Sequence, residues 1–165
     1  MIDAGLLRVA RDLAVRADSD GSDYRVAIST AYYALFHRFA GCCADALIGE
    51  EGPNRTERAW LQAYRSFNHG AVSAACKRVL NQRSSLGFPE GILNFARCFP
   101  SAQSLRHRAD YDPVFSPGTL DAIAHLEAIT EAAEALGATP TRHVRAFAAY
   151  VLFEQGRKNI ERDGT

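Results

Sequence analysis

The sequence lacks the features that mark several classes of protein. It holds only 6 prolines and 12 glycines in 165 residues, too few for a disordered or collagen-like chain. No apolar run reaches the length of a membrane span, and the first residues lack the uninterrupted apolar core of a signal peptide. We therefore expect no membrane partner and no secretory leader.

Cysteine is also scarce, and its spacing excludes the usual metal and redox motifs. The four cysteines follow no zinc-ligand pattern, and neighbouring Cys42 and Cys43 point about 100° apart on a helix. His107, His125 and His143 lack partners at metal-ligand spacing. We therefore predict buried thiols in a reducing cytoplasm, no metal site and no cofactor.

Net charge is absent as well, because 19 Lys and Arg residues balance 19 Asp and Glu residues. No overall field therefore draws the protein toward nucleic acid or a membrane. The cations are uneven, since seventeen arginines stand against two lysines. Arginine forms planar, bidentate contacts with carboxylate or phosphate, whereas codon bias in a GC-rich genome explains the same excess without a function. Both interpretations stay open.

Helical periodicity is present along most of the chain, and no segment alternates as a strand does. The cluster at residues 18–23 predicts a helix N-cap, and Pro100 predicts a kink or split in its helix. Residues 81–89 read as a loop. Helices are predicted over residues 3–17, about 24–47, 60–65, about 71–80, 89–111, 122–136 and 144–151. We predict an all-α, single-domain, up-and-down bundle over residues 1–165, with residues 156–165 as a frayed tail.

The helix predicted from Tyr24 to Leu47 carries two stripes. An apolar stripe predicts the centre of the core, and a neighbouring strip of small residues suits the close approach of another helix, which favours a homodimer. The apolar stripe is Ile28, Leu35, Phe39 and Cys43, and the small-residue strip is Ala27, Ala31 and Ala34.

Residues 24–40, YRVAISTAYYALFHRFA, resemble the second helix of HEPN-domain proteins. The segments AYRSFNHG (63–70) and RHRADYDP (106–113) are similar to segments of uncharacterised bacterial HEPN-like proteins. The resemblance covers residues 3–136, and STAYYALFH is its most specific element. It implies a compact helical bundle, a homodimer, and a link to RNA in toxin–antitoxin or defence systems. Active members of the family are metal-independent ribonucleases.

The family's nuclease signature is an Arg, four to six residues, and a His beside the dimer interface. In this chain Arg106 is followed after four residues by Tyr111, and only three residues separate Arg65 from His69. A His can accept the proton of the ribose 2′-OH and an Arg can stabilise phosphate charge, but tyrosine is a poor base at neutral pH. The catalytic candidates are Arg106, Tyr111, Arg65 and His69, and the RNA-binding candidates are Arg108, His107 and Asn68.

Each candidate also has a purely structural interpretation. Arg106 can pair with Asp110 at the i,i+4 spacing of a helix, with Tyr111 packed as a lid. Arg65 and His69 either share one helix face, or Gly70 ends the helix and places His69 at its C-terminal end, where the dipole favours a charged imidazole. His37, beside Tyr32, Tyr33 and Phe36, is a stacking platform or a hydrogen-bonded core residue.

These observations leave three functions open. The first is a HEPN-like, RNA-directed protein whose Arg-x4-Tyr replaces the nuclease motif. The second is a non-catalytic helical module for dimerisation or for binding another protein. The third is an active metal-independent endoribonuclease. We predict that Arg65, His69, Arg106 and Tyr111 converge on one polar surface near a dimer interface.

Overall fold

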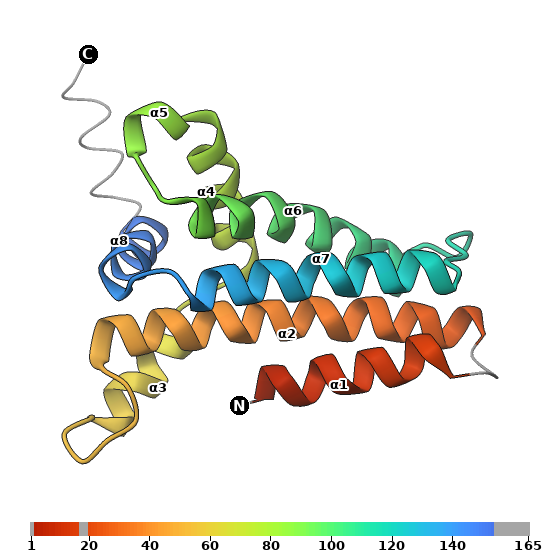
Figure 1. Cartoon of the computed structure of the whole chain (residues 1–165), viewed down its shortest axis with the longest axis horizontal. Coiled ribbons are helices and arrows are strands. Elements are labelled where there is room, and N and C mark those ends of the chain that lie inside the picture. The colour runs from red at the N-terminus through yellow and green to blue at the C-terminus, as the bar shows by residue number, and fades with distance from the viewer. Residues whose placement is uncertain (1, 17–19, 154–165) are drawn as a thin grey trace.

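The computed structural model describes residues 2–16 and 20–153, which form a bundle of α-helices without a strand in that part of the chain (Figure 1). The all-α fold is therefore confirmed. The predicted tail at residues 156–165 lies outside the described residues. The helices are α1 (Ile2–Val15), α2 (Gly21–Ile48), α3 (Glu57–Arg65), α4 (His69–Asn81), α5 (Arg83–Leu86), α6 (Glu90–Tyr111), α7 (Thr119–Gly137) and α8 (Thr141–Leu152).

Helix α2 is the centre of the bundle and packs against α1, α3, α6, α7 and α8. Figure 1 shows it running the length of the molecule between α1 and α7. Its first turn is held by a capping box: the Asp20 carboxylate accepts from the amides of Ser22 and Asp23, and the Asp23 carboxylate accepts from the amide of Asp20. The predicted N-cap therefore lies at Asp20.

Both stripes predicted on α2 are buried in the chain itself. The apolar stripe, from Ile28 to Cys43, has no exposed surface, which confirms its place in the core. The small-residue strip, from Ala27 to Ala34, is at most 1% exposed. It is therefore covered by the chain's own helices, and its use as a dimer surface was wrong. The small residues do allow helices to pack closely, but these helices belong to the same chain.

Two local features of the helices differ from the predictions. Helix α6 continues through Pro100, so the predicted split was wrong, although proline removes one backbone hydrogen bond and costs about 3 kcal/mol in a helix interior. Packing against α2, α4 and α7 supports α6 around this residue. Residues 83–86, predicted as loop, form the single turn α5, which ends at Gly87 in the left-handed region with φ 62°. Leu86 packs against the core and holds this turn in place.

The connection from α6 to α7 is fixed by the start of α2. The guanidinium of Arg25 donates to the carbonyl oxygens of Asp112 at 2.9 Å and Phe115 at 2.7 Å. The Thr119 hydroxyl donates to the Tyr24 hydroxyl at 2.7 Å. These bonds position the end of α6, where most of the predicted site residues lie.

The four cysteines are unpaired in the structure. Cys43 and Cys76 are buried, and Cys42 and Cys98 are half-buried. Burial raises the pKa of each thiol, to about 12 at Cys76 and about 11 at Cys98, so all four are protonated at neutral pH. None of the described helices is both long and apolar enough to cross a bilayer.

Candidate functional site

Polar side chains from α4 and α6 gather around Tyr33, which lies on α2. The Arg106 guanidinium donates a hydrogen bond to the Tyr33 hydroxyl and lies 5.2 Å from the centre of its ring. The His69 ring meets the Tyr33 ring edge-on at 6.0 Å, and the Tyr111 ring lies 5.7 Å from the Arg106 guanidinium. We call Tyr33, His69, Arg106 and Tyr111 the Tyr33 cluster.

Arg106 is held from its own helix as well. Its Nε lies 2.8 Å from Oδ2 of Asp110, the i,i+4 pair that the sequence predicted, and both side chains are about three-quarters buried. Burial opposes the charge on Arg106, but Asp110, Tyr33 and Tyr111 outweigh it and raise the pKa of the guanidinium. Arg106 is therefore a fixed cation, and Asp110 balances part of its charge.

His69 is the first residue of α4, and this position overturns both predicted arrangements. Arg65 ends α3 and His69 begins α4, so they share no helix face and His69 is at an N-terminal end. Asn68, an RNA-binding candidate, caps α4 by accepting from the Ala71 amide at 2.8 Å. The sequence predicted the break between these two helices, but it placed the start of the second at about Ala71 and so missed Asn68 as the cap. RNA binding by Asn68 stays a prediction.

The His69 imidazole is half-buried between aromatic rings and is neutral at pH 7. It stacks on Phe36 at 3.9 Å, and its Nδ1 lies 2.6 Å from the Tyr32 hydroxyl. Burial lowers its pKa, and the charge of Arg106 and the titration of nearby His37 lower it further. The dipole at the start of α4 acts in the same direction, because it disfavours a cation there.

The contact with Tyr32 decides which nitrogen of His69 carries the proton. Tyr32 is 1% exposed, and burial raises its pKa above the ordinary value, so its hydroxyl stays protonated. Among the described residues, Nδ1 of His69 lies within hydrogen-bond distance of this hydroxyl, and a buried hydroxyl leaves no proton unpaired when it donates. Donation from Tyr32 to Nδ1 places the proton of the neutral ring on Nε2. His69 therefore presents an N–H donor rather than the lone pair of a base.

The remaining predicted residues lie around the cluster or away from it. His107 is exposed and packs its ring 4.9 Å from Tyr111. Arg108 lies 3.9 Å from the Asp112 carboxylate and 4.4 Å from the ring centre of Phe115. Arg65 is exposed, and in the described chain it makes no hydrogen bond, ion pair or ring contact with the cluster. The structure thus brings together His69, Arg106 and Tyr111, and leaves Arg65 outside.

Sequence reasoning missed the role of Tyr32 and Tyr33 as polar partners. Both were assigned to an aromatic surface, yet their hydroxyls contact His69 and Arg106. The available signal was the adjacent pair of tyrosines within STAYYALFH, because a buried or half-buried tyrosine needs a partner for its hydroxyl. His37 follows its structural interpretation: its Nδ1 lies 2.5 Å from the Tyr64 hydroxyl, and the two rings stack.

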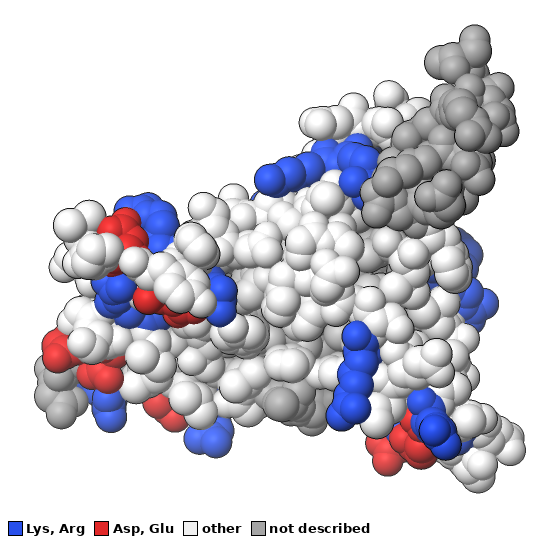
Figure 2. Space-filling model, turned by 180° about the vertical axis from the view of Figure 1, so that it is seen from behind, with Lys and Arg blue, Asp and Glu red and all other residues white. Residues whose placement is uncertain are grey.

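The chemistry of the Tyr33 cluster is that of a donor-rich surface. Among the described residues, no group of three His, Cys, Asp or Glu side chains is placed to hold a metal ion. Figure 2 shows charges of both signs gathered toward the two ends of the molecule, while the middle of that face is largely uncharged. A cation, a neutral N–H donor and an exposed phenol fit an anion next to a planar ring.

Comparison with protein-family models, curated proteins and solved structures finds no significant match. The resemblance to HEPN-domain proteins therefore stays a prediction from the sequence.

Proposed function

We propose that this chain is a HEPN-like, RNA-directed protein that binds RNA at the Tyr33 cluster without cleaving it. One observation carries the proposal: the side chains of His69 and Arg106 come from different helices, and both contact Tyr33. Two of the three segments that resemble HEPN proteins supply these residues, and the third supplies Tyr33 itself.

Each member of the cluster has a role in this proposal. Arg106 contacts a phosphate oxygen as a cation, and the Nε2–H of His69 donates to the same group. Tyr111 is 65% exposed, so its ring is free to stack on an unpaired base. Single-stranded RNA presents phosphate and base faces together, which is why it fits better than a duplex.

Binding without cleavage follows from the lack of a base in the cluster. Cleavage needs a group that accepts the proton of the 2′-OH, and the His69 nitrogen that faces away from Tyr32 already carries a proton. Tyr111 occupies the place of the family's His and is a poor base at neutral pH. Asp110 partly neutralises Arg106, so we expect weak and salt-sensitive binding.

The proposal places the protein in the cytoplasm, as a homodimer, in a toxin–antitoxin or defence setting. Unpaired thiols suit a reducing compartment, and the dimer rests on the resemblance alone. Sedimentation at roughly tens of micromolar protein tests the dimer, because stable dimers associate more tightly than this. Only monomer at that concentration would remove the dimer from the proposal.

A second candidate function is a non-catalytic module that binds another protein. The observation that favours it is a group of exposed apolar side chains at the α6–α7 connection, beside the cluster. Val114 is 86% exposed, Leu120 82% and Tyr111 65%. Exposed apolar groups of this kind are common where proteins meet.

Binding of labelled single-stranded RNA by wild type and two arginine variants tests the proposal. Arg106→Ala should lower affinity about tenfold, which corresponds to about 1.4 kcal/mol, and should reduce the salt dependence by about one phosphate contact. Arg8→Ala is the matched control, because Arg8 also pairs with an aspartate at i,i+4, but on α1. Equal loss in both variants, or no salt-sensitive binding, would reject the site.

The same RNA incubated with chelator tests the absence of cleavage. We expect intact RNA with wild-type protein. Metal-independent cleavage that disappears in His69→Ala would show that His69 acts as a base, and the third function would then replace the first.

A further inference from the structure

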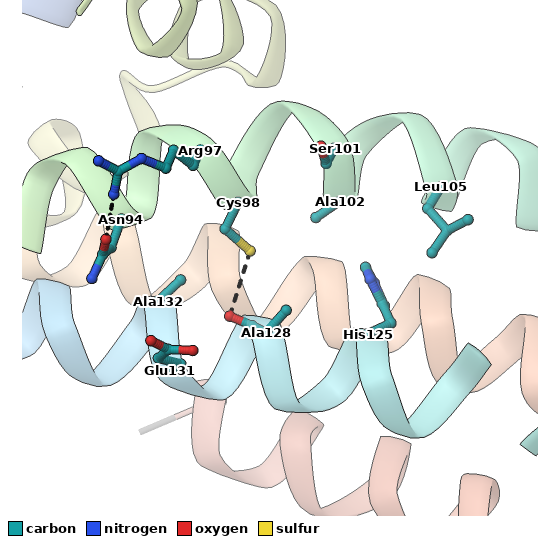
Figure 3. Close-up of a pocket in the computed structure, with 10 residues that line it drawn as sticks. All are labelled: Asn94, Arg97, Cys98, Ser101, Ala102, Leu105, His125, Ala128, Glu131 and Ala132. Atoms are coloured by element: carbon teal, nitrogen blue, oxygen red, sulfur yellow. Dashed lines mark hydrogen bonds between the residues drawn. The ribbon is translucent and has the colours of Figure 1, made fainter. Parts of the chain in front are cut away.

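A groove of about 530 Å³ runs along the outer seam between α6 and α7 (Figure 3). It lies apart from the Tyr33 cluster, which is built from α2, α4 and the end of α6. The groove exists because the residues that face each other across this seam are small. Ala102 comes from α6 and Ala128 and Ala132 come from α7, so no large side chain fills the space between the two helix backbones.

His125 is the unusual residue of this groove. It projects from α7 toward α6, between Ala102 and Leu105, and only 9% of it is exposed (Figure 3). Its Nε2 is buried and has no hydrogen-bond partner in the described chain. A buried polar atom without a partner is costly, so such atoms normally meet a protein group, a water or a ligand.

The chemistry of the free Nε2 follows from the other side of the ring. Burial lowers the pKa of His125 to about 4, against a hydrogen bond with the Ile28 backbone that raises it, so the ring is neutral at pH 7. A hydrogen bond with the backbone raises the pKa of a histidine when a ring N–H donates to a carbonyl oxygen, because this bond stabilises the charged form of the ring. Since Nε2 has no partner in the described chain, the nitrogen that donates to Ile28 is Nδ1. A neutral imidazole has one proton, so donation from Nδ1 leaves Nε2 with a bare lone pair that can only accept.

The other polar groups of the groove are already engaged or lie at its rim. The Cys98 thiol donates to the Ala128 carbonyl at 3.6 Å, and burial keeps it protonated. Arg97 donates to Glu90 and Asn94, both at 2.6 Å. Ser101 and Glu131 also line the groove, and both are exposed. The buried part of the groove is therefore apolar, with one acceptor that lacks a donor in the described chain.

We propose that this groove binds a small neutral molecule with an apolar, planar body and one N–H or O–H group, which donates to Nε2 of His125. The apolar body packs on Ala102, Ala128 and Ala132, and the half-buried Leu105 side chain turns aside to let the donor reach the ring. A neutral molecule is favoured at His125, because the two charged residues that line the groove, Arg97 and Glu131, are exposed, whereas the His125 ring is buried.

Indole and N-methylindole are the probes that test this, because they share a ring system and differ in the N–H donor. The measurement is the 15N resonance of His125 Nε2 in the full-length protein during titration. We expect indole to shift this resonance toward the position of a hydrogen-bonded nitrogen and to bind about tenfold more tightly than N-methylindole, a difference of about 1.4 kcal/mol.

Two variants locate the binding. Ala128→Leu fills the groove from an exposed position on α7, so it should abolish indole binding while the protein stays folded. Ser104→Leu is the control, since Ser104 is exposed on α6 and does not line the groove. It should leave the indole titration unchanged.

Three outcomes would overturn the proposal. Equal affinity for the two probes would mean that Nε2 plays no part. A free protein whose Nε2 resonance already stands at the hydrogen-bonded position, and does not move with indole, would mean that a buried water is the partner. Indole binding that survives Ala128→Leu would place the ligand elsewhere.

Discussion

The hydrogen bond from Arg106 to the Tyr33 hydroxyl joins residues 73 positions apart and ties the end of α6 to the middle of α2. Asp110 holds the same guanidinium from within α6. A side chain restrained from two directions has lost most of its rotamer freedom before any ligand arrives. Arg106 is thereby preorganised beside His69.

We predict that Tyr33→Phe lowers the free energy of unfolding by about 1 kcal/mol, because the hydroxyl accepts a bond from a charged donor that is about three-quarters buried. Urea denaturation measures the change. Tyr111→Phe is the control, because Tyr111 is 65% exposed, and it should be nearly neutral. A neutral Tyr33→Phe would mean that water replaces the hydroxyl without cost.

Arg106→Ala should raise the pKa of His69, because the guanidinium is the second cause of its depression after burial. The pKa should stay below the ordinary value, since burial remains. An NMR titration of the His69 ring protons measures it, with Arg8→Ala as the control. An unchanged His69 pKa in Arg106→Ala would show that the charge of Arg106 interacts with His69 more weakly than the structure indicates.

His125 should make the protein less stable in acid. Its folded pKa, about 4, lies below the unfolded value of 6.5, so the unfolded chain binds the extra proton first as pH falls. Stability is therefore present above pH 6.5, is lost between about pH 6.5 and 4, and changes no further below, with a total loss of about 3 kcal/mol. Urea denaturation at pH 7, 5.5 and 4 measures the loss.

His125→Leu gives the matching control for the acid effect. Whatever its stability at pH 7, this variant should lose less stability between pH 7 and 4 than the wild type. Equal losses would assign the acid sensitivity to other groups.

Gly91→Ala and Gly41→Ala should change stability in opposite directions. A methyl group at Gly91 would lie 2.6 Å from the Ala135 carbonyl oxygen and against the Thr139 hydroxyl, so α6 and α7 would have to separate at a cost of about 1–3 kcal/mol. At Gly41, inside α2, a methyl group meets nothing within 4 Å, and alanine should stabilise by about 0.5–1 kcal/mol. Thermal unfolding compares the two variants.

Phe39→Ala should cost about 3–5 kcal/mol, because the ring has no exposed surface and stacks on Phe95 at 4.9 Å. Val114→Ala, at a position 86% exposed, should change stability by less than about 0.5 kcal/mol. A small effect at Phe39 would mean that the core collapses around the cavity. Chemical denaturation of both variants provides the comparison.

Local features of the molecule were predictable from the sequence. The periodicity of α2, the cap at Asp20 and the i,i+4 pair of Arg106 and Asp110 depend on residues within one or two turns of each other, so their spacing contains the information. The break after Arg65 was also predicted, but the place of His69 was misread, because spacing alone does not show that α4 begins at His69 rather than at about Ala71.

The sequence by itself determined the all-α class, the central helix and the residues able to carry charge or donate hydrogen bonds. The tertiary structure alone decided which of these residues meet. His69 and Arg106 converge on Tyr33, the small-residue strip of α2 is buried within the chain, and His125 points into a groove with one nitrogen that has no partner among the described residues. The reason is physical: helical periodicity sets which face of a helix is apolar, whereas packing of several helices sets which faces touch.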